Sequence, residues 1–238
     1  MSLAVALLAA GCNEGRPSGA TRTPERGRPT PGAYTATEVV GGGSLSGRVA
    51  WVGPTPEAVT VPGSMDPELC GAEPRLPLLV IGARGGVAGS VVVLDGISSG
   101  RALEIPSEPA ALRISGCAFS PHVVAVGRGS RLRIENGDPL LHHARATDGR
   151  GSLRFDIGLP MLGAASELTL DEPGILRVRD DAGHPGMLGW VHVVEHPYFA
   201  VTDGEGRFRI ESIPPGTYSV RVWHEGVRSA PGDGAVSA

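Results

Sequence analysis

Short apolar runs separated by turn residues constrain the fold of this chain more than any other feature of its sequence. The 238 residues include 36 glycines and 21 prolines, and many of the apolar residues between them recur at period two, as at Leu132 and Ile134. After residue 12, no apolar spacing of three and four residues persists over three helical turns, so neither a helical bundle nor alternating strand–helix units are expected. The sequence therefore predicts an all-β protein of short strands in a Greek-key sandwich.

Individual strands can be predicted from this pattern. Residues 90–94 form a continuous apolar run, which is typical of a strand buried on both faces. Gly127 and Gly129 lie between two alternating segments and predict a hairpin turn. In the last segment, a hairpin turn is predicted around 203–206 and a second turn at 214–216.

The first twelve residues resemble a bacterial lipoprotein signal. Met1 to Ala10 are apolar, too short to span a bilayer, and run into Gly11-Cys12. The resemblance implies that Cys12 carries lipid and anchors the chain to a membrane of the cell envelope, at the periplasmic face of the outer membrane or at the cell surface. The alternative is a plain signal peptide with an incidental cysteine. Residues 13–43 are rich in Pro, Gly, Thr and Arg, and predict a disordered tether.

Cysteine count and net charge indicate which covalent cross-link and which kind of partner to expect. If Cys12 is lipidated, Cys70 and Cys117 remain as an even pair in an oxidising compartment, where a disulfide is the default expectation. The formal net charge of −4 suggests no nucleic-acid partner.

Two segments near the ends of the ordered region resemble a carboxypeptidase regulatory-like, or transthyretin-like, β-sandwich. The first half of that family's pattern matches residues 47–49 and 87–94. The second half matches a T-D-x-x-G-x-F-x-I…P-P-G-x-Y-x-V pattern, present as Thr202, Asp203, Gly206, Phe208, Ile210, Pro214, Pro215, Gly216, Tyr218 and Val220.

The intervening segment is similar to cupredoxins of the plastocyanin type. The matching residues are Phe119, Pro121, His122, Val123, Gly129, Leu132, Ile134, Asn136, Asp138, Leu141 and His142. Together the two resemblances imply a cupredoxin-like domain at 106–196, inserted in or joined to a regulatory-like sandwich made of 44–105 and 197–228. Residues 229–238 are then a C-terminal tail.

The cupredoxin resemblance also implies a copper site with an altered ligand set. By motif position, His142 and His184 match the two histidine ligands and Met187 the axial methionine, while Asp180 occupies the place of the cysteine. A carboxylate supplies neither the intense visible band nor the covalency of a copper–thiolate bond. The implied cofactor is copper in a type 1 site without its thiolate. The alternative is a structural lipoprotein that holds no metal and presents its sandwich to an unidentified envelope protein.

An enzyme is not expected from the sequence. Residues 96–100 match G-x-S-x-G around Ser98, but a nucleophile elbow needs a helix after it and a parallel sheet, and the residues that follow predict neither.

Overall fold

The computed structural model describes residues 3–7, 34–61, 63–76, 79–227 and 235–237. Cys12, and the part of the expected tether before Tyr34, lie outside these residues. Among the described residues, none of the helices is long and apolar enough to cross a membrane. The described chain is almost entirely β, which confirms the predicted fold class.

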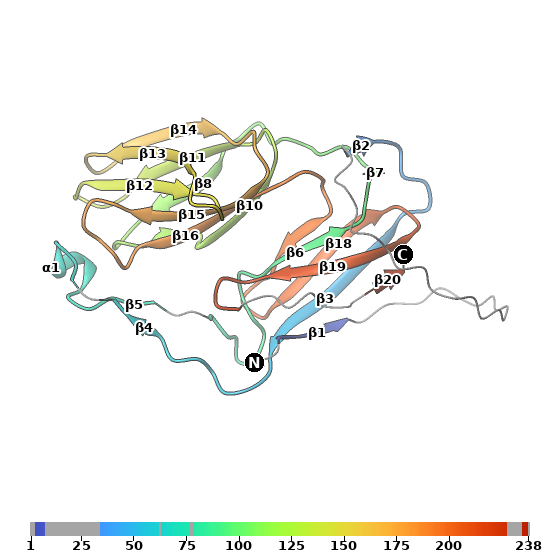
Figure 1. The fold of residues 1–238 in the computed structure, drawn as a ribbon, viewed down its shortest axis with the longest axis horizontal. Helices are drawn as coiled ribbons and strands as arrows, with labels where there is room; N and C mark the ends of the chain where they lie inside the picture. Colours follow the sequence, from blue (N-terminus) through green and yellow to red (C-terminus); the bar gives the residue numbers. More distant parts are fainter. Residues whose placement is uncertain (1–2, 8–33, 62, 77–78, 228–234, 238) are drawn as a thin grey trace.

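One sandwich, which we call the inner sandwich, is built from a single continuous stretch of the chain (Figure 1). Its first sheet has the order β10-β16-β15-β12-β13 and its second the order β14-β11-β8-β9. The strands are β8 (Ala110–Ile114), β9 (Phe119–Ser120), β10 (Val123–Gly127), β11 (Arg131–Asn136), β12 (His142–Thr147), β13 (Leu153–Leu159), β14 (Ala165–Thr169), β15 (Gly174–Asp180) and β16 (Leu188–Val194).

A second, outer sandwich combines strands from before and after that stretch. One sheet has the order β1-β3-β18 and the other β17-β6-β19-β20, and a short pair β2-β7 lies beside them. The strands are β1 (Leu3–Leu7), β2 (Thr35–Ala36), β3 (Gly43–Trp51), β6 (Val91–Asp95), β7 (Ser99–Gly100), β17 (Phe199–Val201), β18 (Arg207–Ile213), β19 (Thr217–Trp223) and β20 (Ala235–Ser237). The chain therefore leaves the outer sandwich, forms the inner one and returns.

Between β3 and β6 the chain makes an excursion, which we call the strap (59–61 and 63–76). It contains β4 (Val59–Thr60), the four-residue helix α1 (Pro67–Cys70) and β5 (Arg75–Leu76). β4 and β5 pair antiparallel. The strap carries α1 to the end of the inner sandwich where β15 leads into β16 (Figure 1).

Alternation along the strands separates core from surface. In β11 the burial alternates residue by residue, with Leu132 and Ile134 fully buried. Each sandwich has its own apolar core, and a third, smaller cluster that includes Val91, Val93, Val123 and Val194 lies between the two sandwiches. Since β6 sends Val92 and Leu94 into the outer core and Val91 and Val93 toward the inner sandwich, the prediction of a strand buried on both faces is confirmed.

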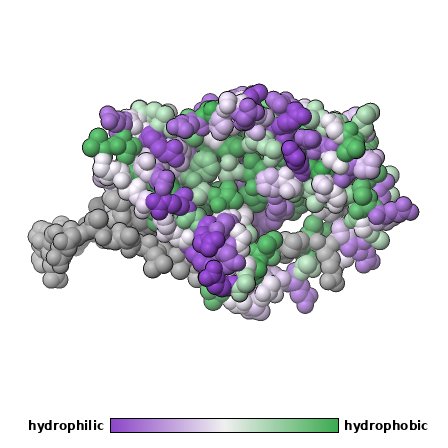
Figure 2. All heavy atoms as spheres, turned by 180° about the vertical axis from the view of Figure 1, so that it is seen from behind, coloured by the Kyte–Doolittle hydropathy of each residue, from purple (hydrophilic) through white to green (hydrophobic). Residues whose placement is uncertain are grey.

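Hydrophobic side chains also reach the surface. A band of them crosses the middle of the face shown in Figure 2, with hydrophilic side chains above and below it. Large exposed apolar residues include Met65, Leu141, Met161 and Leu162.

The predicted hairpins are wrong, although their turns lie where expected. β10 and β11 belong to different sheets, and the same is true of β17 and β18. Each turn carries the chain across the sandwich from one sheet to the other, as Greek-key connections do. Period-two alternation and glycine mark a change of direction, but they do not distinguish a hairpin from a crossing between sheets.

Order also begins earlier than the predicted boundary at residue 44. The Tyr34 hydroxyl donates a hydrogen bond to the carbonyl of Arg101 at 2.6 Å, and β2 pairs in parallel with β7. These partners lie more than sixty residues away in the chain, so local composition could not indicate them.

Candidate metal centre

The strand register brings His142 and Asp180 to one end of the same sheet. β12 begins at His142, β15 ends at Asp180, and Ala144 is the residue paired with Asp180. Because side chains alternate along a strand, His142 lies on the same face as Ala144, next to Asp180. Asn136, which is fully buried, donates to the carbonyls of Leu140 and Leu159 and so fixes the loop that leads into His142.

His184 and Met187 lie on the loop between β15 and β16. The backbone N–H of Met187 donates to the carbonyl of His184 at 3.0 Å, which closes a tight turn. The Met187 side chain is buried in the core of the inner sandwich and, together with His184, borders a small cavity.

A single buried carboxylate faces both histidines. Nδ1 of His142 lies 3.0 Å from Oδ2 of Asp180, and Nδ1 of His184 lies 3.0 Å from Oδ1. The two ring centroids are 4.8 Å apart. All three residues are buried, with 0%, 2% and 6% exposure for His142, His184 and Asp180. One atom from each of the three lies within 4.8 Å of the other two.

The opposite nitrogen of each imidazole also meets a carboxylate. Nε2 of His142 lies 3.1 Å from Oδ2 of Asp138, and Nε2 of His184 lies 2.8 Å from Oδ2 of Asp66 on the strap. Asp138 is itself held by the backbone N–H groups of Gly116 and Cys117. The result is an alternating chain of three carboxylates and two imidazoles.

These contacts determine the protonation states of the metal-free site. Burial raises the pKa of Asp180, but the hydrogen bonds from His142, from the N–H groups of His143 and Ala182, and from His184 outweigh burial and lower it overall. Burial lowers the pKa of His142, but Asp180 and then Asp138 outweigh burial and raise it. The site therefore holds an ionised carboxylate next to an imidazole that retains its proton more readily than usual.

The donor set fits a divalent cation of borderline softness. Two imidazole nitrogens and a carboxylate oxygen are ligands common to Zn²⁺ and Cu²⁺. In metal-binding histidines the nitrogen that does not ligate usually donates to a carboxylate or carbonyl, which fixes ring orientation. His142 and His184 both have that second carboxylate. The residues present therefore fit a His–His–Asp site in which Nδ1 of each ring is the ligand atom.

Cys117 does not supply the missing thiolate. Its sulfur is bonded to that of Cys70, with the Cα atoms 5.2 Å apart. Cys117 lies near Asp138 and His142, but a disulfide sulfur is not a thiolate donor. The disulfide attaches the strap to the loop between β8 and β9.

The remaining predicted features lie apart from this centre. His143 points to the other face of β12, where it contacts Asp156 at 2.5 Å. Ser98 is exposed and precedes the two-residue strand β7, and no helix follows it within the described residues.

Sequence reasoning missed the roles of Asp138 and Asp66. Asp138 could have been found, because it precedes His142 by four residues within the cupredoxin-like pattern. Asp66 is separated from His184 by 118 residues and lies in a segment with no regular pattern, so no local signal indicated it.

Comparison with known proteins gives only structural neighbours. No family model matches the chain, and no curated protein matches it. Among solved structures, it is similar to amicyanin from Paracoccus versutus, with 19% identity and a TM-score of 0.33 over 38% of this chain and 86% of that one. It is also similar to a purple cupredoxin from Nitrosopumilus maritimus, with 22% identity and a TM-score of 0.31 over 36% of this chain and 99% of that one.

A third neighbour is the copper-containing nitrite reductase from Thermus scotoductus SA-01, with 21% identity and a TM-score of 0.33. The match covers 40% of this chain and 24% of the reductase, so the chain spans about a quarter of that protein's length.

Proposed function

We propose that this chain is a non-enzymatic metal-binding protein of the cell envelope, whose inner sandwich holds one Cu²⁺ ion through His142, His184 and Asp180. The observation that supports this proposal most strongly is the arrangement around Asp180. Nδ1 atoms of two buried imidazoles face the two oxygens of one buried carboxylate, and a further carboxylate holds each Nε2.

In this proposal, each residue around the ion has its own role. Asp138 and Asp66 keep a proton on Nε2 of His142 and His184, so that Nδ1 of each ring is the nitrogen that gives up its proton and ligates. Asp180 neutralises part of the cation's charge in a site that excludes water. Met187, on the same loop as His184, would be a further candidate donor through its thioether sulfur.

The replacement of the thiolate by a carboxylate favours binding over electron transfer. When copper is bound, it supplies a Lewis-acidic, redox-active centre, and hard oxygen donors favour its divalent state. We therefore expect a pale protein that holds Cu²⁺, rather than an intensely coloured electron carrier.

Copper stoichiometry tests this function. In calorimetric titration of the metal-free protein, we expect about one Cu²⁺ per wild-type chain, and a loss of that binding in His184→Ala and in Asp180→Asn. His143→Ala is the matched control, because His143 belongs to the neighbouring position on β12 but faces away. Undiminished binding in His184→Ala and Asp180→Asn would refute the proposed site.

One observation favours a second candidate, a scaffold without metal. Each ring nitrogen of His142 and His184 already has a carboxylate partner, so the hydrogen-bond network of these two residues is complete without a cation. In that case the wild type would bind no more copper than His184→Ala, and the function would lie in contacts with another envelope protein.

The membrane anchor is a separate proposal that rests on the lipoprotein-like start of the sequence. Cleavage before Cys12 would remove β1, so the pairing of β1 with β3 would belong to the unprocessed chain. We expect the full chain to be found in the membrane fraction of bacterial cells and Cys12→Ser to move to the soluble fraction. Equal partition of the two proteins would rule out lipid attachment at Cys12.

A further inference from the structure

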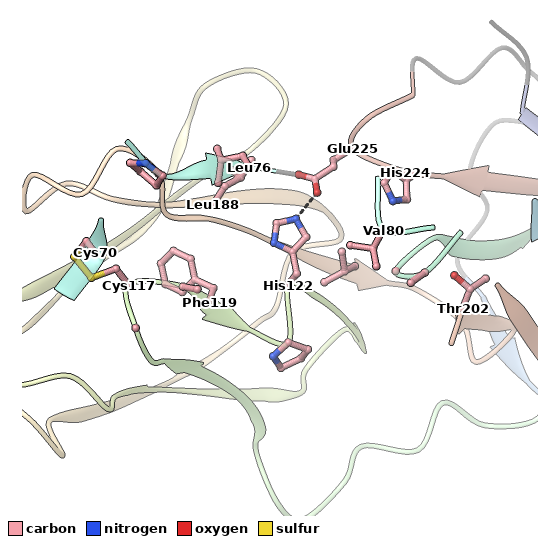
Figure 3. Close-up of a pocket in the computed structure, with 18 residues that line it drawn as sticks. Cys70, Leu76, Val80, Cys117, Phe119, His122, Leu188, Thr202, His224 and Glu225 are labelled. Carbon is pink, nitrogen blue, oxygen red and sulfur yellow. Dashed lines mark hydrogen bonds and ion pairs between the residues drawn. A yellow bond between two sulfur atoms is a disulfide. The ribbon is translucent and has the colours of Figure 1, made fainter. Parts of the chain in front are cut away.

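A second site lies outside the metal centre, where the two sandwiches and the strap meet. A cavity of about 610 Å³ opens there, and each of the three parts contributes to its wall. Figure 3 shows the disulfide of Cys70 and Cys117 at one end of the cavity, Thr202 at the other, and His122 and Glu225 between them. Cavities of 300–1,000 Å³ at domain junctions are typical small-molecule sites.

The wall of this cavity is mainly apolar. Leu76 and Pro74 come from the strap, Phe119 and Leu188 from the inner sandwich, and Val80 from the chain leading into the outer one. His142, Asp180 and His184 do not line it. The cavity is thus a site distinct from the metal centre, although the loop of Gly186 borders both.

Four polar side chains interrupt the apolar wall, namely His122, Glu225, Thr202 and His224. The Thr202 hydroxyl donates to the carbonyl of Val87, and Nδ1 of His224 accepts from the N–H of Gly226, so His122 and Glu225 form the pair considered for a ligand.

The Glu225 side chain is only 7% exposed, and its two oxygens accept hydrogen bonds from Nε2 of His122 and from the indole N–H of Trp190. Burial raises the pKa of Glu225, but His122, then Trp190 and His224, outweigh it and lower that pKa. Glu225 is therefore an ionised acceptor whose oxygens are already engaged.

This pairing leaves one nitrogen of His122 for a ligand. Since Nε2 faces Glu225, Nδ1 is the ring nitrogen that remains for a hydrogen bond with a ligand. Nε2 is the only His122 ring nitrogen with a hydrogen bond among the described contacts, and the ring lies between Phe119 and Glu225 (Figure 3).

The charged side chains around the cavity restrict the net charge that a ligand can carry. None of the described lining residues is an arginine or a lysine, so an anionic ligand would meet no permanently charged cation. The single carboxylate is already paired with His122, which leaves no free counter-charge for a cationic ligand. We propose that this cavity binds an uncharged, largely apolar small molecule with one polar group that hydrogen-bonds to Nδ1 of His122.

Two dyes with the same ring system test the proposal. N-phenyl-1-naphthylamine is uncharged, carries one N–H donor and fluoresces in apolar surroundings, whereas 1-anilinonaphthalene-8-sulfonate adds an anionic group. With the metal-free full chain, we expect saturable fluorescence enhancement with the first dye and an affinity at least about tenfold weaker for the second, since its charge would be buried without a partner.

Variants then locate the binding. His122→Phe keeps an aromatic ring of similar size but removes the ring nitrogens, so the affinity for N-phenyl-1-naphthylamine should fall about tenfold, as expected for one lost hydrogen bond. Ala118→Trp and Val80→Trp place bulk at exposed positions of the cavity wall and should abolish saturable binding. His143→Ala is the control histidine change and should bind like the wild type. Circular dichroism would confirm that each variant is folded.

Three results would overturn the proposal. These are no saturable binding of N-phenyl-1-naphthylamine to the wild type, equal affinity for the two dyes, or unchanged binding in folded Ala118→Trp and Val80→Trp. None of them would bear on copper binding, because the dye measurements use the metal-free protein.

Discussion

At the scale of single residues, Asp180 determines what chemistry this site can support. Its side chain is fully buried and faces Nδ1 of both His142 and His184. An ionised carboxylate in that position is stable only because imidazoles and backbone N–H groups surround it. The same geometry would place a shorter thiolate next to both rings.

Asp180→Cys should therefore restore an intense colour. We expect Cu²⁺ to produce a strong visible absorption band in this variant, because copper–thiolate bonding supplies the intensity that a carboxylate cannot. Absorption spectra of wild type, Asp180→Cys and Asp180→Ser after addition of copper would check this. A colourless Asp180→Cys that still binds copper would mean that residue 180 does not reach the metal.

The carboxylate–imidazole contacts around His142 should stabilise the metal-free fold most at mildly acidic pH. The pKa of His142 is raised in the folded state, so its contribution is complete below about 6.5 and is lost as pH rises through the folded pKa. The pKa values of Asp138 and Asp180 are lowered, so their contribution is present above about 3.8 and is lost as pH falls through their folded values.

Thermal unfolding between pH 3 and pH 9, with a chelator present, measures this dependence. We expect the difference in Tm between the wild type and His142→Ala to be largest between about pH 4 and pH 6.5 and to narrow at alkaline pH. The lowered pKa values of His192, His196 and His224 affect both proteins alike, so the difference isolates His142. A difference that grows from pH 6 to pH 9 would contradict the raised pKa of His142.

At this scale, motif positions indicated residues that the structure brings together, but not all of their partners. The cupredoxin-like pattern indicated His142, Asp180, His184 and Met187, and the structure brings both histidines to Asp180. It could not indicate Asp66, because that contact depends on how the strap crosses the molecule.

At the scale of elements, the strap joins the outer sandwich to the candidate metal centre. Its backbone N–H at Met65 donates to the carbonyl of Gly183 at 3.1 Å, and its Asp66 reaches His184. A side chain on Gly183 would collide with Met65. The strap thus covers the loop that carries His184, and the disulfide of Cys70 and Cys117 holds it there.

Removal of that disulfide should destabilise the protein. The bond spans 47 residues, for which chain entropy alone gives about 4 kcal/mol of stabilisation. We expect the double variant Cys70→Ser/Cys117→Ser to show a lower denaturant midpoint and faster proteolysis within 59–76. Unchanged stability and unchanged cleavage would mean that the strap is held by its other contacts.

Asp66→Asn should weaken copper binding without removing it. The amide can no longer hold the proton on Nε2 of His184 as a carboxylate does, and loss of such outer partners typically costs 10–100-fold in metal affinity. Glu68→Gln is the matched control, because Glu68 is an exposed acidic residue of α1, the helix that begins directly after Asp66. Equal copper affinities in Asp66→Asn and Glu68→Gln would show that Asp66 does not contribute to copper binding.

Composition and alternation predicted the type of element well but not its partners. The buried run at 90–94 became β6 because apolar surfaces lie on both of its sides. The glycine turns at 127–129 and 203–206 were located correctly, yet each connects two sheets, since the pairing of a strand depends on residues far along the chain.

At the scale of the whole molecule, the two sandwiches share an interface. Val91 and Val93 of β6 pack against Val123 and Val194 of the inner sandwich, and Glu225 reaches across to His122 and Trp190.

Because of this shared interface, calorimetry should give one unfolding transition for the wild type. It should give two for Glu225→Ala if the hydrogen bonds of Glu225 are needed for the two sandwiches to unfold together. Two transitions already in the wild type would show that the sandwiches unfold independently.

The measurement that tests the central claim most directly is the paramagnetic resonance of bound Cu²⁺ in protein labelled with ¹⁵N at histidine. We expect the electron spin of Cu²⁺ to couple with similar strength to two imidazole nitrogens in the wild type. In His142→Ala and in His184→Ala it should couple to only one. A nitrogen count that is the same in all three proteins, or no bound copper in the wild type, would contradict a metal centre at His142, Asp180 and His184.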